Sequence, residues 1–264
     1  MTRRIARPKP EPGRMSGFTL IELMIALLIG VFLLGALLTI VQTNRAVFGD
    51  QNKLAQLQDG ERMAMTMMSD VIQSAGYFPA PVAPSVTSQA MALPVSTAFG
   101  ATYSTATQSI TGIYQASAQG DQLSVRYMTA SGDNVLNCSG TSNTTGANTL
   151  YVNTFEVLID ANGVGQLVCI MNGQQYDLVS GVTNLSVLYG VKQSATAPGN
   201  SADTYMTAND INTINPTLWT NVISVMVQLT FTNPMYNAAN PGPLQPTITV
   251  QRVIGVMNQS GPMT

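Results

Sequence analysis

A long apolar run near the start of the chain limits what this sequence can fold into. Residues 18–41 contain a single charged side chain, that of Glu22. A helix of this length rises roughly 36 Å, and the hydrocarbon core of a bilayer is about 30 Å thick. The sequence therefore predicts one membrane-spanning helix. Glu22 is its anomaly, because an acidic side chain costs about 3 kcal/mol at the centre of a membrane and less near an end.

Basic residues gather before this run. Five of the 11 Lys and Arg side chains precede residue 18, together with one acid, Glu11, of the 13 in the chain. By the positive-inside rule, this places the N-terminus in the cytoplasm and the rest of the chain outside. A conventional signal peptide fits less well, because its apolar part has about 7 to 15 residues and is followed by a small-residue cleavage site.

Gly17, Phe18 and Glu22 hold a fixed spacing at the head of the apolar run. The basic leader, the glycine, the segment Phe18-Thr19-Leu20-Ile21-Glu22 and the apolar helix together resemble the class III prepilin signal of type IV pilins. In that family a membrane peptidase cuts after the glycine and methylates the new N-terminal residue. The resemblance implies cleavage between Gly17 and Phe18, methylation of Phe18, and a role for Glu22 in assembly and register.

Two physical accounts of Glu22 are open. The amine of Phe18, once freed, is a cation in or near the lipid, and the carboxylate of a neighbouring subunit would neutralise it in a packed filament. Alternatively, Glu22 lies in the first turns of its own helix, where the helix dipole favours an acid by about 0.3 to 1 kcal/mol. The two effects are compatible, and the resemblance favours the intermolecular one.

The helix is predicted to continue beyond the membrane. Apolar side chains recur at a spacing of about 3.6 residues, and Gly76 and Pro79 form a stop signal. The stripe comprises Val47, Leu54, Leu57, Met65, Met68 and Ile72. The expected organisation is a removed leader (1–17), a membrane or filament-core half-helix (18–41), an amphipathic half-helix (42–76) and a globular β-rich head (77–264).

Beyond Gly120 the sequence has the character of strands. Segments rich in β-branched and aromatic residues are 122–129, 150–159, 165–171, 174–178, 182–191, 222–232 and 247–257. Asn162-Gly163 and Asn172-Gly173 are hairpin signals. The stretch 79–120 is predicted as loops with one or two short elements. The stretches 137–148 and 194–216 are predicted as loops, the second with a helical turn around 208–211. The predicted fold class is α+β: a long N-terminal helix packed on an antiparallel β-sheet domain, as in pilins.

Two cysteines, Cys138 and Cys169, lie well beyond the predicted span and therefore in an oxidising compartment. One bridge between them would close a loop worth about 3 to 4 kcal/mol in the chain-entropy account. Two free buried thiols are the alternative. A metal site is not expected, because the cysteines lack ligand spacing and the chain has no histidine.

The residues that catalysis needs are few. The absence of histidine excludes Ser-His and Cys-His nucleophiles. The acid pairs Glu156/Asp160 and Asp203/Asp210 are interpreted as solvated strand ends and loop caps, and a Ca²⁺ site at Asp203, Asn209 and Asp210 is a minor alternative. We expect no enzyme activity, no cofactor and no metal.

Nucleic-acid binding is not expected either. Removal of residues 1–17 leaves 6 basic and 12 acidic side chains (11 minus 5 and 13 minus 1), so the mature chain is acidic. Arg126, Lys192 and Arg252 are isolated in the sequence, whereas nucleic-acid binding proteins cluster their cations.

Residues 70–77 and 181–225 resemble corresponding segments of PilW-type minor pilins. The resemblance implies a minor pilin that enters the inner membrane with a periplasmic head and then reaches the pilus and cell surface. Its implied role is to prime pilus assembly, extending to a place at the tip, with prepilin peptidase, other minor pilins and the major pilin as partners. Two alternatives stay open: a minor pseudopilin of a type II secretion system, and a membrane-tethered enzyme or binding module.

Overall fold

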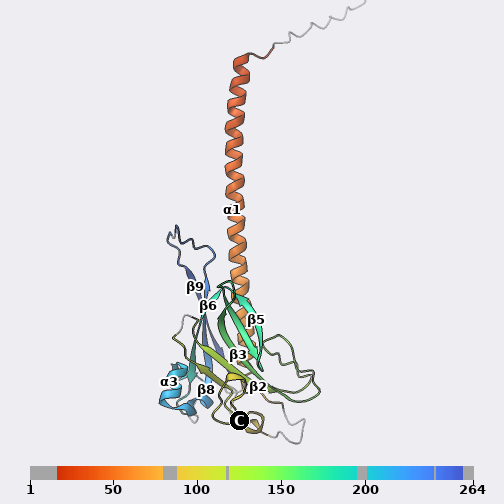
Figure 1. Ribbon diagram of the computed structural model, residues 1–264, viewed down its shortest axis with the longest axis vertical. Helices are drawn as coiled ribbons and strands as arrows, with labels where there is room; N and C mark the ends of the chain where they lie inside the picture. The colour runs from red at the N-terminus through yellow and green to blue at the C-terminus, as the bar shows by residue number, and fades with distance from the viewer. Residues whose placement is uncertain (1–16, 80–87, 117–118, 195–200, 241, 258–264) are drawn as a thin grey trace, which may run out of the picture. The chain divides into compact units, whose positions relative to one another are not determined.

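The computed structural model describes residues 17–79, 88–116, 119–194, 201–240 and 242–257. Contacts divide the chain into two units between Asn52 and Lys53. Helix α1 (Leu20–Gln73) makes up most of the described part of the first unit and continues into the second (Figure 1). The predicted helix of residues 18–76 is thus present, and it starts two residues later and ends three residues earlier than expected.

The second unit contains two antiparallel sheets (Figure 1). The first has the order β1-β2-β3-β4-β5, formed by β1 (Ile110–Ile113), β2 (Gln122–Thr129), β3 (Thr149–Ile159), β4 (Gly165–Met171) and β5 (Gln174–Ser180). The second has the order β7-β6-β8-β9, formed by β6 (Val182–Val191), β7 (Thr204–Met206), β8 (Val222–Thr232) and β9 (Thr247–Gly255). The connections contain α2 (Gln89–Ala92), η1 (Ala98–Gly100), α3 (Ala208–Ile214) and η2 (Pro216–Asn221).

The first sheet is a meander whose turns were predicted from the sequence. Asn172 and Gly173 have φ values of 48° and 86°, which is the left-handed conformation that a two-residue hairpin turn requires at both positions. The resulting register pairs Met171 with Gln174. Residues 160–164, which include Asn162-Gly163, form the hairpin between β3 and β4. Both predicted hairpins are confirmed.

The two sheets are joined where β2 begins. The amide of Asp121 donates to the carbonyl of Leu185 on β6 (2.7 Å), and the Asp121 carboxylate accepts from the amide of Val187 (2.8 Å). Gly120 has a φ of 85°, and a Cβ there would collide with the Leu185 carbonyl. This position therefore requires glycine, and the junction holds the sheets at a fixed spacing.

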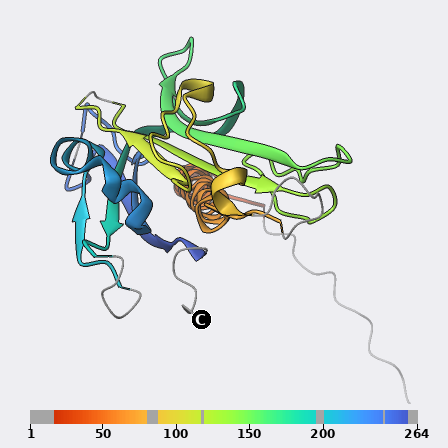
Figure 2. The ribbon, with the colours of Figure 1, turned by 90° about the horizontal axis from the view of Figure 1, so that it is seen from below.

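The end of α1 packs between the two sheets (Figure 2). Its buried side chains recur every three or four residues and share one core with apolar residues of both sheets. The buried helix residues are Ala64, Met65, Ser69, Met68, Val71 and Ile72. The predicted stripe is confirmed at Met65, Met68 and Ile72, and Leu57 is partly buried. It is wrong at Val47 and Leu54, which are exposed because the core begins further along the helix.

The α+β class is confirmed, and the structure adds elements that the sequence pattern missed. The short strand β1 lies in the stretch where one or two short elements were expected but not located, and β7 lies in a stretch that was predicted as a loop. Strands of four and three residues are too short to show an alternating pattern, and β1 also contains Gly112. The predicted helical turn near residue 208 is present as α3, which begins with a capping box between Thr207 and Asp210.

We expect Met68→Ala to destabilise the head by about 2 to 5 kcal/mol, because the removed side chain is fully buried. Met63 lies on the same helix and is 50% exposed, so Met63→Ala is the matched control and should change stability by less than about 0.5 kcal/mol. Denaturant unfolding of the full chain in detergent measures both. Equal effects of the two variants would show that α1 is not packed as described.

Candidate functional site at the head of the N-terminal helix

The peptide bond between Gly17 and Phe18 lies in exposed, irregular backbone just before α1. Phe18 is 88% exposed, and a Cβ on Gly17 would meet no atom within 4 Å. A peptidase needs such an accessible segment, because it must bind the backbone on both sides of the bond. The geometry is compatible with the predicted cleavage, and cleavage and methylation stay predictions.

Thr19 and Glu22 form a reciprocal cap on α1. The amide of Glu22 donates to Thr19 Oγ1 (3.4 Å), while the Glu22 carboxylate accepts from the amide (3.4 Å) and hydroxyl (3.3 Å) of Thr19. This is the capping box of the pattern Thr-x-x-Glu. The Thr-x-x-Glu spacing is visible in the sequence, and neither predicted account of Glu22 included Thr19.

The cap holds the Glu22 carboxylate loosely. All three hydrogen bonds are longer than the usual 2.7 to 3.2 Å, and Glu22 is exposed. In the isolated chain, Glu22 therefore interacts with the start of its own helix. This arrangement also leaves the carboxylate accessible to a second, cationic partner.

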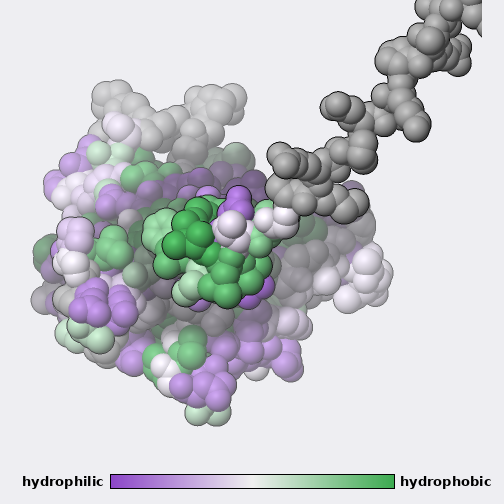
Figure 3. Space-filling view, turned by 90° about the horizontal axis from the view of Figure 1, so that it is seen from above, coloured by the Kyte–Doolittle hydropathy of each residue, from purple (hydrophilic) through white to green (hydrophobic). Residues whose placement is uncertain are grey.

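The following residues present an apolar surface of membrane type. Residues 20–41 are exposed except for Gly30, and no charged side chain occurs between Glu22 and Arg45. Within the described residues, α1 is the one helix long and apolar enough to cross a membrane, by length and composition. Seen end-on, this part of the helix is covered by hydrophobic side chains (Figure 3).

Two threonines in and just beyond this segment satisfy their hydroxyl groups within the helix. Thr39 donates to the carbonyl of Gly35, and Thr43 donates to the carbonyl of Thr39, both over 2.9 Å. In lipid no water is present to bond a hydroxyl, so an internal acceptor removes most of the cost of placing it there.

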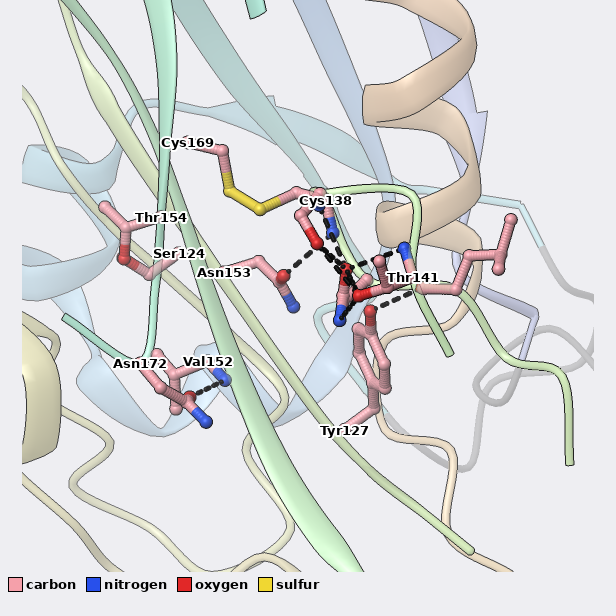
Figure 4. Close-up of a disulfide and its surroundings, with 12 residues drawn as sticks. Ser124, Tyr127, Cys138, Thr141, Val152, Asn153, Thr154, Cys169 and Asn172 are labelled. Carbon is pink, nitrogen blue, oxygen red and sulfur yellow. Dashed lines mark hydrogen bonds between the residues drawn. A yellow bond between two sulfur atoms is a disulfide. The ribbon is translucent and has the colours of Figure 1, made fainter. Parts of the chain in front are cut away.

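In the second unit, Cys138 and Cys169 form a disulfide (Figure 4). Cys138 belongs to the long connection between β2 and β3, and Cys169 is buried on β4. The amide of Cys138 also donates to Asn153 Oδ1 on β3 (3.1 Å). The connection is thereby fastened to two neighbouring strands.

Side-chain hydrogen bonds fix the rest of this connection. The hydroxyl of Tyr127 donates to the carbonyl of Leu136 (2.7 Å), as Figure 4 shows. The buried amide of Asn143 donates to the carbonyls of Thr129 (3.0 Å) and Ala147 (2.8 Å). Residues 130–148 thus have a defined shape with little regular secondary structure, because polar side chains replace strand partners.

Arg126 has a structural role that the sequence did not indicate. Arg126 is isolated from other cations in the sequence, whereas in the structure its side chain is fully buried and donates to three carbonyls. These belong to Gln108 (2.7 Å), Pro94 (2.6 Å) and Leu93 (3.2 Å), and the guanidinium lies 4.0 Å from the centre of the Tyr103 ring. Burial lowers the pKa of Arg126 to about 10, so the side chain stays charged at neutral pH.

The acidic residues of the candidate catalytic and Ca²⁺ sites accept hydrogen bonds from neighbouring strands, turns and helix caps. Glu156 accepts from the side chain of Gln122 (2.9 Å). The amide of Val164, with smaller contributions from Asn162 and Gln166, holds the pKa of Asp160 below its usual value. Asp203 accepts from the amide of Gln193, and Asp210 caps α3. Among the described residues, no group of three or more His, Cys, Asp or Glu is placed to hold a metal ion.

Two family models match the chain. Residues 13–38 match the prokaryotic N-terminal methylation motif, which covers Gly17, Phe18 and Glu22. Residues 141–253 match type IV pilus-assembly protein W, from within the disulfide-bonded connection between β2 and β3 to a residue near the end of β9. No curated protein and no solved structure matched the chain significantly. The prepilin motif and the apolar helix together fit a single-pass anchor in the inner membrane.

We expect replacement of both cysteines by alanine to destabilise the head by about 3 to 4 kcal/mol, because the bridge restricts the unfolded chain. Unfolding of the full chain in detergent measures this. Intact mass with and without reductant gives an independent check, and the native protein should take up no thiol reagent. Labelling of either cysteine in native protein would contradict the bridge.

We expect Arg126→Lys to lower the free energy of unfolding by about 3 kcal/mol or more. A lysine cannot bond to all three carbonyls at once, so buried acceptors would lose their partner. The same change at the exposed Arg252 is the control and should fall within about 0.5 kcal/mol. Thermal or denaturant unfolding distinguishes them. If Arg126→Lys left the stability unchanged, the guanidinium would not be the group that holds residues 93–108 in place.

Proposed function

We propose that this chain, a minor pilin of the type IV pilus, primes pilus assembly and takes a place at or near the pilus tip. Prepilin peptidase is proposed to cut between Gly17 and Phe18 and to methylate Phe18. The mature helix then enters a complex with other minor pilins and the major pilin. The role is non-enzymatic: the chain acts by packing and not by chemistry.

The single observation that carries this proposal is the combination of two matched regions in one chain. The motif at 13–38 supplies a cleavable head on an exposed apolar helix, and the region at 141–253 supplies a head of the pilus-assembly type. A plain membrane tether needs no prepilin motif, and the match at 141–253 favours the pilus over a secretion pseudopilin. The proposed path is insertion with a cytoplasmic N-terminus and periplasmic head, then incorporation into the pilus.

Glu22 is proposed to set the register of the helix in the assembly. Its exposed carboxylate lies in the first turn of α1, four residues from the amine that cleavage would free on Phe18. Pairing with the amine of a neighbouring subunit neutralises two charges that are costly in lipid. The loose Thr19 cap supports this, because the carboxylate loses little when it exchanges that cap for an ion pair.

Mass spectrometry of the native protein tests processing. We expect the mature chain to begin at Phe18 and to carry one methyl group on its amine. This form should be found in sheared pili, and it should be lost in cells that lack the prepilin peptidase. A native chain that begins at Met1, or at any residue other than Phe18, would refute the proposal.

We expect Glu22→Ala to be processed normally and to reach sheared pili at about one tenth of the wild-type amount, which corresponds to about 1.4 kcal/mol. Thr19→Ala is the matched control, because it removes the cap and keeps the carboxylate. It should be incorporated at near wild-type levels. Equal losses for the two variants would assign Glu22 to the stability of its own helix, and wild-type levels of Glu22→Ala would remove its role in register.

A further inference from the structure

Strand β9 presents an open edge. It is the last strand of the second sheet and pairs with β8 on one side, while no described strand pairs with its other side. With nine residues it is the longest of the edge strands β1, β5, β7 and β9. Natural proteins usually shorten such an edge or protect it with lysine or proline. The sequence of β9 contains neither residue.

The hydrogen-bond pattern shows which amides point out of this edge. In an antiparallel ladder, opposed residues alternate between pairs that exchange hydrogen bonds and pairs whose backbone groups point away. Val256 donates to the carbonyl of Ile223, and Asn233 donates to that of Pro246, at the two ends of the ladder. The even-numbered residues of β9 therefore bond to β8. The backbone groups that point outward belong to Thr247, Thr249, Gln251, Val253 and Gly255.

The strand carries one charge, and its placement limits what can bind. Arg252 is exposed and has no ion-pair partner among the described residues. If β9 paired with its own copy in the full-length antiparallel register, Gln251 would face Gln251 and the two Arg252 side chains would be diagonal neighbours about 7 to 8 Å apart. Like charges on neighbouring strands are unfavourable, so a strand with a carboxylate fits this edge better than a second copy does.

We propose that the open edge of β9 takes up an extended segment from the head of a different pilus subunit by β-strand addition, with an acidic residue of that segment beside Arg252. The main-chain groups of the odd-numbered residues provide the binding, and Arg252 selects the partner. This rests on the proposed function, because it supplies one of the contacts through which a minor pilin recognises its neighbours.

Thr249→Pro tests the edge in the full chain in its native cells. Proline removes an outward N–H and leaves the main-chain bonds to β8 in place, which edge strands tolerate. It also removes the contact between the hydroxyls of Thr249 and Thr230 on β8 (3.4 Å). We expect its amount in sheared pili to fall about tenfold. The matched control is Thr249→Val, which loses the same hydroxyl contact with Thr230 but keeps the N–H, and it should be incorporated at wild-type levels.

Charge reversal tests the acidic partner independently. Arg252→Glu should lower incorporation by a similar factor, whereas Arg252→Lys keeps the charge and should not. Neither change removes a hydrogen bond within the described structure, so the head should remain folded. The unfolding midpoint of each purified variant in detergent checks this. If Thr249→Pro lowers the midpoint, the incorporation of Arg252→Glu alone decides the outcome.

Three results would overturn the proposal. Wild-type incorporation of both Thr249→Pro and Arg252→Glu would refute it and leave the proposed function intact. If the purified wild-type chain were dimeric in detergent and the Thr249→Pro variant were monomeric, the edge would bind a second copy of this chain. A wild-type chain that is absent from sheared pili would overturn both this inference and the proposed function.

Discussion

The need to pair backbone polar groups away from water shapes every part of this chain. In lipid a segment must satisfy its own amides and carbonyls, and an uninterrupted helix does so. The hydroxyls of Thr39 and Thr43 follow the same rule by bonding to helix carbonyls. Within the head, Arg126 meets three carbonyls of residues 93–108 that have no strand partners. At β9, backbone amides and carbonyls on one edge have no described strand partner, and another chain could pair with them there.

The elements that the sequence predicted well are those governed by local chemistry. Strands β2, β4, β6 and β8 match their predicted bounds, because each contains at least seven residues with a strong β-branched or alternating pattern. The turn at Asn172-Gly173 was equally predictable, since few residue pairs adopt two positive φ values. At the head of α1, the spacing of Gly17, Phe18 and Glu22 identified the motif that the family comparison then matched.

What the sequence could not show depends on contacts between distant segments. The two sheets are joined at Gly120 and Asp121, which pair with a strand more than 60 residues away. The burial of Arg126 is equally invisible, because its acceptors lie in a segment with no pattern of its own. Leu54 shows the converse: it continues the helical stripe, and nothing in the stripe tells where the sheets begin to cover it.

The disulfide ties the order of maturation to the compartment in which the head folds. The segment that Cys138 fastens consists mostly of loops, so before oxidation it depends on scattered side-chain bonds alone. A thiol pair in the reducing cytoplasm cannot close this link, whereas one exposed to the oxidising side can. On the proposed path, in which the head crosses the bilayer, the connection would therefore gain its covalent link to β4 only after export.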